Sequence, residues 1–272
     1  MNKKRTAIIF AACAANEHGL NVFLRIMSHI EQEFRDAHVF VGINPCRMQS
    51  RLIQHLQNSQ LNLQYDITPE KLIIDSDASA FQTALRLLLK TQDHFDLIWF
   101  VHTKSSTNFS HEPTLDWLLF NLLRNRYLVE DTFLHSSIGV CGVDIVIHPD
   151  PIEDLISQYK SYPFSQLQLM FLFTFYVIRG SIVHRFIETC SNSFFNERIN
   201  SDRYFFERDF YQIAFMSGYQ PSFLHAPQLH FNDWDKVVCN RDTVFKTVND
   251  WIIENNSSTS NASMINVSMM GR

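Results

Sequence analysis

The sequence predicts an α/β protein in which helices cover both faces of a mostly parallel central sheet. Over residues 6–101, short apolar runs typical of strands alternate with stretches whose apolar residues recur at helical spacing. This order of elements is typical of a parallel sheet with helices packed on its faces. The 272 residues are 46% hydrophobic and 19% charged, which is enough to bury a sizeable core and excludes wholesale disorder.

The apolar pattern also locates the individual elements. Pro45 stops the second strand, and Ser76 or Asp77 is placed to cap the third helix. In the first part of the chain, strands are expected over residues 6–15, 37–43, 61–65 and 95–101, and helices over residues 20–34, 47–58 and 78–92. In the less regular remainder, helices are expected over residues 112–123, 180–190, 202–217 and 242–254, and strands over residues 138–143 and 175–178. Residues 255–272 are rich in Asn and Ser and are expected to form a disordered tail.

Composition excludes several classes of protein. The net charge of −5 and the pI near 6.2 argue against a nucleic-acid partner, whose binding surface would be basic. The seven glycines form neither a Rossmann dinucleotide fingerprint nor a P-loop. Residues 167–178 are the most apolar later run and fall short of the roughly 20 residues that a membrane span needs, so we expect no transmembrane segment. The five widely spread cysteines contain no CxxC pair and indicate reduced thiols in a cytoplasmic protein.

The polar residues that follow the expected strands are candidates for a binding site. In a parallel sheet, ligands bind at the carboxyl ends of the strands, in the crevice where the strand order reverses. Asn16 and Asn44 follow the first two strands. The strand over residues 95–101 leads into four residues that offer a ring nitrogen, hydroxyls and a point charge suited to phosphate, namely His102, Thr103, Lys104 and Ser105. The alternative is a solvated loop that only ends a strand.

Several of these segments resemble those of a known family. The His102-Thr103-Lys104 segment, followed by a helix containing Trp117, resembles the GT-A-type glycosyltransferases of the rhamnan-synthesis group. Segments at residues 133–142, 176–181 and 206–210 are also similar to that family, and the resemblance covers roughly residues 6–235. It implies a GT-A-like, Rossmann-type sandwich that transfers a sugar from a nucleotide-sugar donor to a glycan acceptor, with an inverting outcome.

The resemblance also bears on how the leaving group is stabilised. Many GT-A enzymes hold a divalent metal with an Asp-x-Asp motif after the fourth strand, where this chain has His102 and Lys104. Because protein cations can stabilise a departing diphosphate, we expect a metal-independent mechanism in which Arg179 is a further donor-binding residue. Arg203 and Arg208 are possible helpers of the same kind.

A metal-dependent alternative rests on a different pair of carboxylates. Asp75 and Asp77 form a literal Asp-x-Asp that could bind Mg²⁺ or Mn²⁺ together with the donor phosphates. The competing interpretation, which we favour, is an N-cap with an acidic first turn, because a helix begins at once after Asp77.

An inverting transfer needs a base to deprotonate the acceptor hydroxyl. Glu207 and Asp209 are the candidates, and Asp144 is a weaker one. Glu207 lies four residues after Arg203, so an ordinary surface ion pair on a helix is the alternative interpretation.

These observations combine into one expectation. Residues 1–254 would form a single domain, with a nucleotide-facing half at about residues 1–110 and an acceptor-facing half at about residues 111–254. Asn16 and Asn44 would lie near the nucleotide. The enzyme would need no cofactor beyond its nucleotide-sugar co-substrate, although Mg²⁺ or Mn²⁺ is possible. The alternatives are a catalytically silent nucleotide-sugar-binding module of the same fold and an α/β phosphotransferase, which the lack of phosphate-cradling glycines disfavours.

Overall fold

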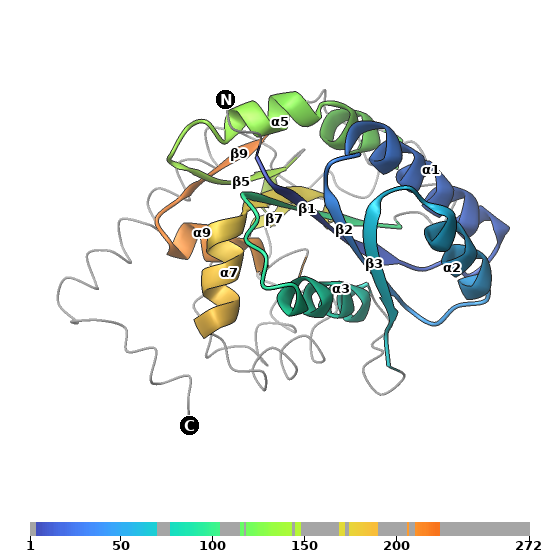
Figure 1. Ribbon diagram of the computed structural model, residues 1–272. Coiled ribbons are helices and arrows are strands. Elements are labelled where there is room, and N and C mark those ends of the chain that lie inside the picture. The colour runs from blue at the N-terminus through green and yellow to red at the C-terminus, as the bar shows by residue number, and fades with distance from the viewer. Residues whose placement is uncertain are drawn as a thin grey trace.

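A seven-stranded mixed sheet forms the centre of the protein in the computed structural model, which describes residues 4–69, 77–103, 115–116, 118–142, 145–147, 169–171, 174–189, 206 and 210–223. Its strand order is β3-β2-β1-β4-β8-β5-β9 (Figure 1). Strands β1 to β4 are parallel to one another, and β8 runs antiparallel to both of its neighbours. The strands are β1 (Thr6–Ala12), β2 (His38–Ile43), β3 (Asn62–Ile67), β4 (Leu97–His102), β5 (Ile138–Gly142), β8 (Tyr176–Arg179) and β9 (Gln220–Phe223).

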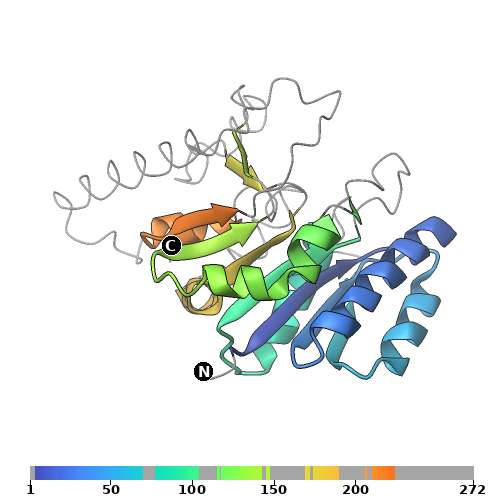
Figure 2. The same ribbon diagram turned by 90° about the horizontal axis from the view of Figure 1, so that it is seen from above.

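Helices pack on both faces of this sheet. In Figure 1, α1 and α5 lie above the sheet and α3 and α7 lie below it. Figure 2 shows from above that the helical segment containing α5 continues the layer begun by α1 and α2. The helices are α1 (Glu17–Glu33), α2 (Gln49–Asn58), α3 (Ala78–Lys90), the π-helix η3 (Leu119–Arg124), α5 (Arg126–Thr132), α7 (Gly180–Thr189), the 3-10 turn η7 (Phe210–Gln212) and α9 (Ile213–Met216). A separate antiparallel pair is formed by β6 (Ile145–Ile147) and β7 (Leu169–Phe171).

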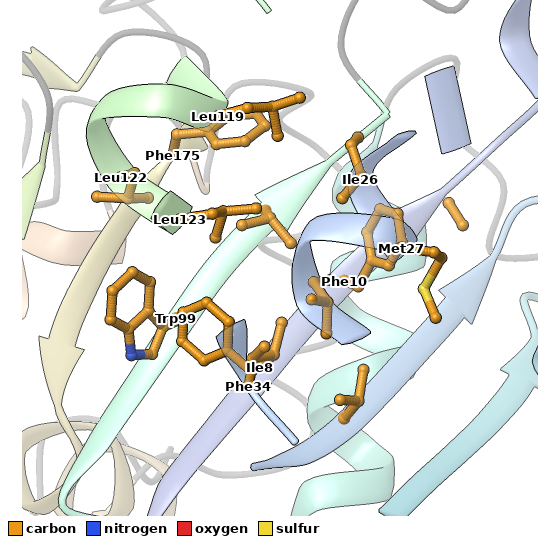
Figure 3. Close-up of a cluster of buried hydrophobic side chains, with 14 of the residues drawn as sticks. Ile8, Phe10, Ile26, Met27, Phe34, Trp99, Leu119, Leu122, Leu123 and Phe175 are labelled. Carbon is orange, nitrogen blue, oxygen red and sulfur yellow. The ribbon is translucent and has the colours of Figure 1, made fainter. Parts of the chain in front are cut away.

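The alternation of side chains along β1 explains the two layers. Every residue of β1 is buried, and successive residues point to opposite faces because the strand has a period of two. Ile8 and Phe10 join the core under α1, whereas Ala7 and Ile9 join the core under α3. Figure 3 shows the first of these cores, in which residues of β1 and β4 meet α1, η3 and the residue before β8: Ile8, Phe10, Ile26, Met27, Phe34, Trp99, Leu119, Leu122, Leu123 and Phe175. The predicted α/β class, with a mostly parallel sheet and helices on both faces, is confirmed.

A glycine allows α3 to begin directly against the carboxyl end of β2. A Cβ atom added at Gly42 would lie 1.8 Å from the carbonyl oxygen of Ala80. Only a residue without a side chain permits this approach, so Gly42 sets the depth at which the first turn of α3 packs. Asp77, a residue of the candidate site, immediately precedes that turn.

Some elements differ from those expected. The first strand ends at Ala12 rather than at residue 15, and residues 119–124 are wound as a π-helix. Within the expected helix at 202–217, the described residues form the short elements η7 and α9. Strand β9 was not predicted. The expected helix at 242–254 and the expected tail at 255–272 lie outside the described residues. Across the described part of the chain, no helix is both long enough and apolar enough to cross a membrane.

Candidate functional site

The carboxyl ends of β1 and β4 flank the point where the strand order reverses. From β1 the chain builds β2 and β3 on one side of the sheet, and β4 then returns to pair with the other side of β1. Ligands of open α/β sheets bind in the crevice outside such a point. In the register of these two strands, His102 lies beside Ala11, so the predicted His102-Thr103 segment leaves the sheet there.

Thr103 links the carboxyl ends of β1 and β4 through two hydrogen bonds. Its N–H donates to the carbonyl oxygen of Ala11 over 3.1 Å, and its side-chain oxygen accepts from the N–H of Cys13 over 3.0 Å. The residue is only 3% exposed. Thr103 therefore lies at the predicted edge, where its hydroxyl group holds the loop after β1.

His102 is a buried histidine held on one side by a carboxylate. Its Nδ1 donates a hydrogen bond to the Asp77 carboxylate at the start of α3. The ring packs against Phe81 and Phe175, with centroid separations of 6.2 and 5.5 Å. Among the described residues, its Nε2 has no hydrogen-bond partner although that atom is buried. Buried polar atoms are nearly always paired, so this unpaired ring nitrogen at the carboxyl end of β4 is a candidate for ligand binding.

Asp77 occupies the predicted N-cap position of α3, but its side chain has a different partner. The residue does stand at the N-cap position of α3, and its carbonyl accepts from the N–H of Phe81 over 2.9 Å, as the cap interpretation requires. Its side chain, however, makes no capping hydrogen bond and instead contacts His102. Asp75, its partner in the metal-dependent alternative, lies outside the described residues. No three or more Cys, His, Asp or Glu side chains in the described ranges are grouped to hold a metal ion.

Both asparagines lie at the expected edge of the sheet. The Asn16 side chain accepts from the N–H of Gly19 over 2.9 Å and so caps α1. The Asn44 N–H donates to the carbonyl oxygen of Ala12 over 3.0 Å, and this residue is 8% exposed. The Asn16 side chain therefore has a structural role as a helix cap. This role accounts for an asparagine at this position without any contact to a nucleotide.

Arg179 is placed at the opposite end of the sheet from His102, so the structure does not bring it together with the other predicted donor-binding residues. Because β8 is antiparallel to β4, Arg179 pairs with Leu97, the first residue of β4, whereas His102 is the last. Its guanidinium donates to the carbonyl oxygens of Phe133, His135 and Ile138. Burial lowers the pKa of this group. Arg179 therefore stabilises the turn before β5.

The remaining predicted site residues lie outside the described residues. These are Lys104, Ser105, Glu207 and Asp209, together with the weaker candidates Asp144, Arg203 and Arg208.

Two cysteines at the same edge were not predicted as part of the site. Cys13 follows β1 and Cys46 follows β2, and the N–H of Ala14 donates to the sulfur of Cys46 over 3.3 Å. The Cys13 thiol donates a hydrogen bond to the Cys46 sulfur, which raises the pKa of Cys13. The same hydrogen bond and the N–H groups of Ala14 and Met48 outweigh burial and lower the pKa of Cys46 to about 6. The two cysteines are 33 positions apart and form no recognisable motif in the sequence. Only the pairing of β1 with β2 brings them together.

Comparisons with known proteins do not assign the site. The sequence matches no protein-family model and no curated protein.

Proposed function

We propose that this chain is a GT-A-like glycosyltransferase that moves a sugar from a nucleotide-sugar donor to a glycan acceptor. The observation that carries the proposal is the His102 ring, which lies at the topological switch point with Nδ1 bound to Asp77 and with a buried Nε2 that has no partner among the described residues. The resemblance of the His102-Thr103-Lys104 segment to the rhamnan-synthesis group supports the same function.

The chemistry of the donor matches this arrangement. Departure of a nucleoside diphosphate builds negative charge on the β-phosphate, and a hydrogen-bond donor already positioned in a dry site stabilises that charge. A protonated His102 would donate from Nε2 to a phosphate oxygen, while Asp77 keeps the ring oriented through Nδ1. Lys104 follows two residues later and would add a point charge.

The contact between Asp77 and His102 favours the metal-independent mechanism over the Asp75 and Asp77 alternative. A carboxylate already bound to a ring N–H would have to leave it before binding Mg²⁺ or Mn²⁺ together with donor phosphates. In this proposal Glu207 or Asp209 is the base that activates the acceptor, and the reaction inverts the sugar. The protein would act in the cytoplasm, as its cysteine usage indicates.

The test is a donor-release assay on the full chain with UDP-, GDP- and TDP-sugars, with and without EDTA. We expect at least one donor to release nucleotide, and we expect release to persist in EDTA and to fall in His102→Gln. Complete loss in EDTA would instead support a metal bound by Asp75 and Asp77. Donor binding without release, with or without a glycan acceptor, would support the catalytically silent module. Neither binding nor release with any donor would refute the proposal.

A further inference from the structure

We propose that Cys13 and Cys46 form a reversible intramolecular disulfide, so that this edge of the sheet carries a thiol-oxidation site. The inference concerns the loops after β1 and β2 and holds whether or not the chain is a glycosyltransferase. It rests on the geometry of two loops that the sheet brings together.

The backbone holds the two loops in a fixed relation. The N–H of Asn44 donates to the carbonyl oxygen of Ala12 over 3.0 Å, and the N–H of Met48 donates to the carbonyl oxygen of Ala14 over 3.1 Å. Along the sequence, one of these bonds comes before each cysteine and the other comes after it. The residue after Cys13 reaches the Cys46 sulfur directly, because the N–H of Ala14 donates to that sulfur over 3.3 Å. The pairing of β1 with β2 therefore places the two cysteines in adjacent loops, which a disulfide would join.

Both sulfurs are exposed enough for thiol exchange, and Cys46 is the nucleophile of the pair. Cys13 and Cys46 are half-buried free thiols, whereas Cys141 is fully buried in β5. The three donors around the Cys46 sulfur favour its thiolate, which is the nucleophilic form. Desolvation raises the pKa of Cys141 to about 12, so that residue is inert and serves as an internal control. The negative charge of Asp77 raises the pKa of the Cys13 thiol further.

The reaction requires a low-molecular-weight disulfide as oxidant, and glutathione disulfide is the probe. The Cys46 thiolate attacks one sulfur of glutathione disulfide, which forms a mixed disulfide at Cys46 and releases one glutathione thiolate. Cys13 then loses its proton and attacks the Cys46 sulfur, which forms the Cys13–Cys46 bond and releases the second glutathione. In sum, two protein thiols are oxidised to one disulfide and one glutathione disulfide is reduced to two thiols.

The experiment incubates the full chain in glutathione buffers of increasing oxidising potential, followed by alkylation of the remaining thiols and peptide mapping by mass spectrometry. We expect a peptide pair joined through Cys13 and Cys46, a loss of two titratable thiols, and full reversal by excess reduced glutathione. The variant Cys141→Ser should behave as the wild type. Disulfides that involve Cys190 or Cys239 instead, or no linked pair at any potential, would overturn the proposal.

Two single variants separate the roles of the cysteines. Cys13→Ser should accumulate a glutathione adduct at Cys46, because the resolving thiol is gone, whereas Cys46→Ser should leave Cys13 largely unmodified. Equal adduct formation at Cys46 in the wild type and in Cys13→Ser would contradict the assignment of Cys13 as the resolving thiol. The wild-type peptide map decides the proposal by itself if either variant fails to fold.

A rate measurement on the wild type tests the thiolate directly. Between pH 7 and pH 8.5, alkylation of Cys46 should accelerate by only about 1.1-fold, against roughly 16-fold for an ordinary thiol. If alkylation of Cys46 accelerates as much as that of an ordinary thiol, the surrounding donors do not stabilise its thiolate.

Discussion

His102 is the residue on which the proposed donor site depends. It is the last residue of β4 and lies beside Ala11 of β1, and its Nδ1 donates to the Asp77 carboxylate. Asp77 lies 25 positions away in the sequence and reaches the ring because α3 packs against the same edge of the sheet.

The first prediction concerns the affinity of this ring for the donor. In His102→Gln, loss of a charge-assisted hydrogen bond to phosphate should cost about 1.5–3 kcal/mol, or roughly 10- to 150-fold in Kd for the nucleoside diphosphate. Calorimetric titration with UDP and GDP measures this. The matched control is His135→Gln, which changes an exposed histidine beside Arg179 at the other end of the sheet and should leave Kd unchanged. Equal affinity in both variants would remove His102 from the site.

Asp77 acts through His102 and is therefore a positioning residue. In Asp77→Asn we expect a smaller loss of affinity than in His102→Gln, together with a change in the ring tautomer, because an amide oxygen holds the Nδ1–H less strongly than a carboxylate does. The ¹⁵N chemical shifts of the His102 ring report the tautomer, and a purely structural role for Asp77 would not move them. An unchanged tautomer would show that Asp77 does not position the ring.

Arg179 lies far from the other predicted donor-binding residues. Its positive charge made it a candidate for binding the donor diphosphate, but the antiparallel direction of β8 carries it to the far end of the sheet. In Arg179→Lys the planar fork that serves three carbonyl groups is lost, which should cost about 2 kcal/mol, or roughly 4–8 °C in Tm. Thermal unfolding followed by circular dichroism measures this. A variant of unchanged Tm with weakened nucleotide binding would reverse the assignment.

At the scale of elements, strong apolar periodicity predicted the sheet well as far as β4, and short pairing-dependent segments were missed. Strand β9 consists of Gln220-Pro221-Ser222-Phe223, whose proline argues against a strand. It forms because it is an edge strand paired with β5, where a proline is tolerated. The sequence also did not predict that β8 is antiparallel to its neighbours, because a four-residue apolar run has the same pattern in either direction.

The contact between β2 and α3 links the fold to the site. In Gly42→Ala, the new Cβ would meet backbone rather than a side chain that can rotate, so α3 must shift and carry Asp77 with it. We expect destabilisation of about 1–3 kcal/mol together with weaker nucleotide binding. The control is Gly139→Ala, whose Cβ would meet the Tyr219 side chain at the amino end of β5 and should lower stability alone. Urea unfolding and calorimetric titration separate the two effects, and a Gly42→Ala protein that binds as the wild type does would refute this link.

For the whole molecule, the alternation of strands and helices predicted the sheet edge at which polar residues from several strands meet. The reversal between β1 and β4 brings Cys13, Asn44, His102 and Thr103 to one edge, although they are far apart in the sequence. The sequence predicted the edge and its polar residues. It could not predict which side chains are already engaged in the fold, as Asn16 and Thr103 are, because those bonds follow from the exact meeting of neighbouring loops.

In the proposed donor complex, the Nε2 atom of His102 donates a hydrogen bond to a phosphate oxygen of the nucleotide. The decisive experiment for this contact is to record ¹⁵N spectra of the histidine rings during titration with UDP, GDP and TDP in the presence of EDTA. We predict that one nucleotide shifts the His102 Nε2 resonance saturably toward the protonated value while His135 stays unchanged. If all three nucleotides leave the His102 ring unmoved at millimolar concentration, the account is contradicted.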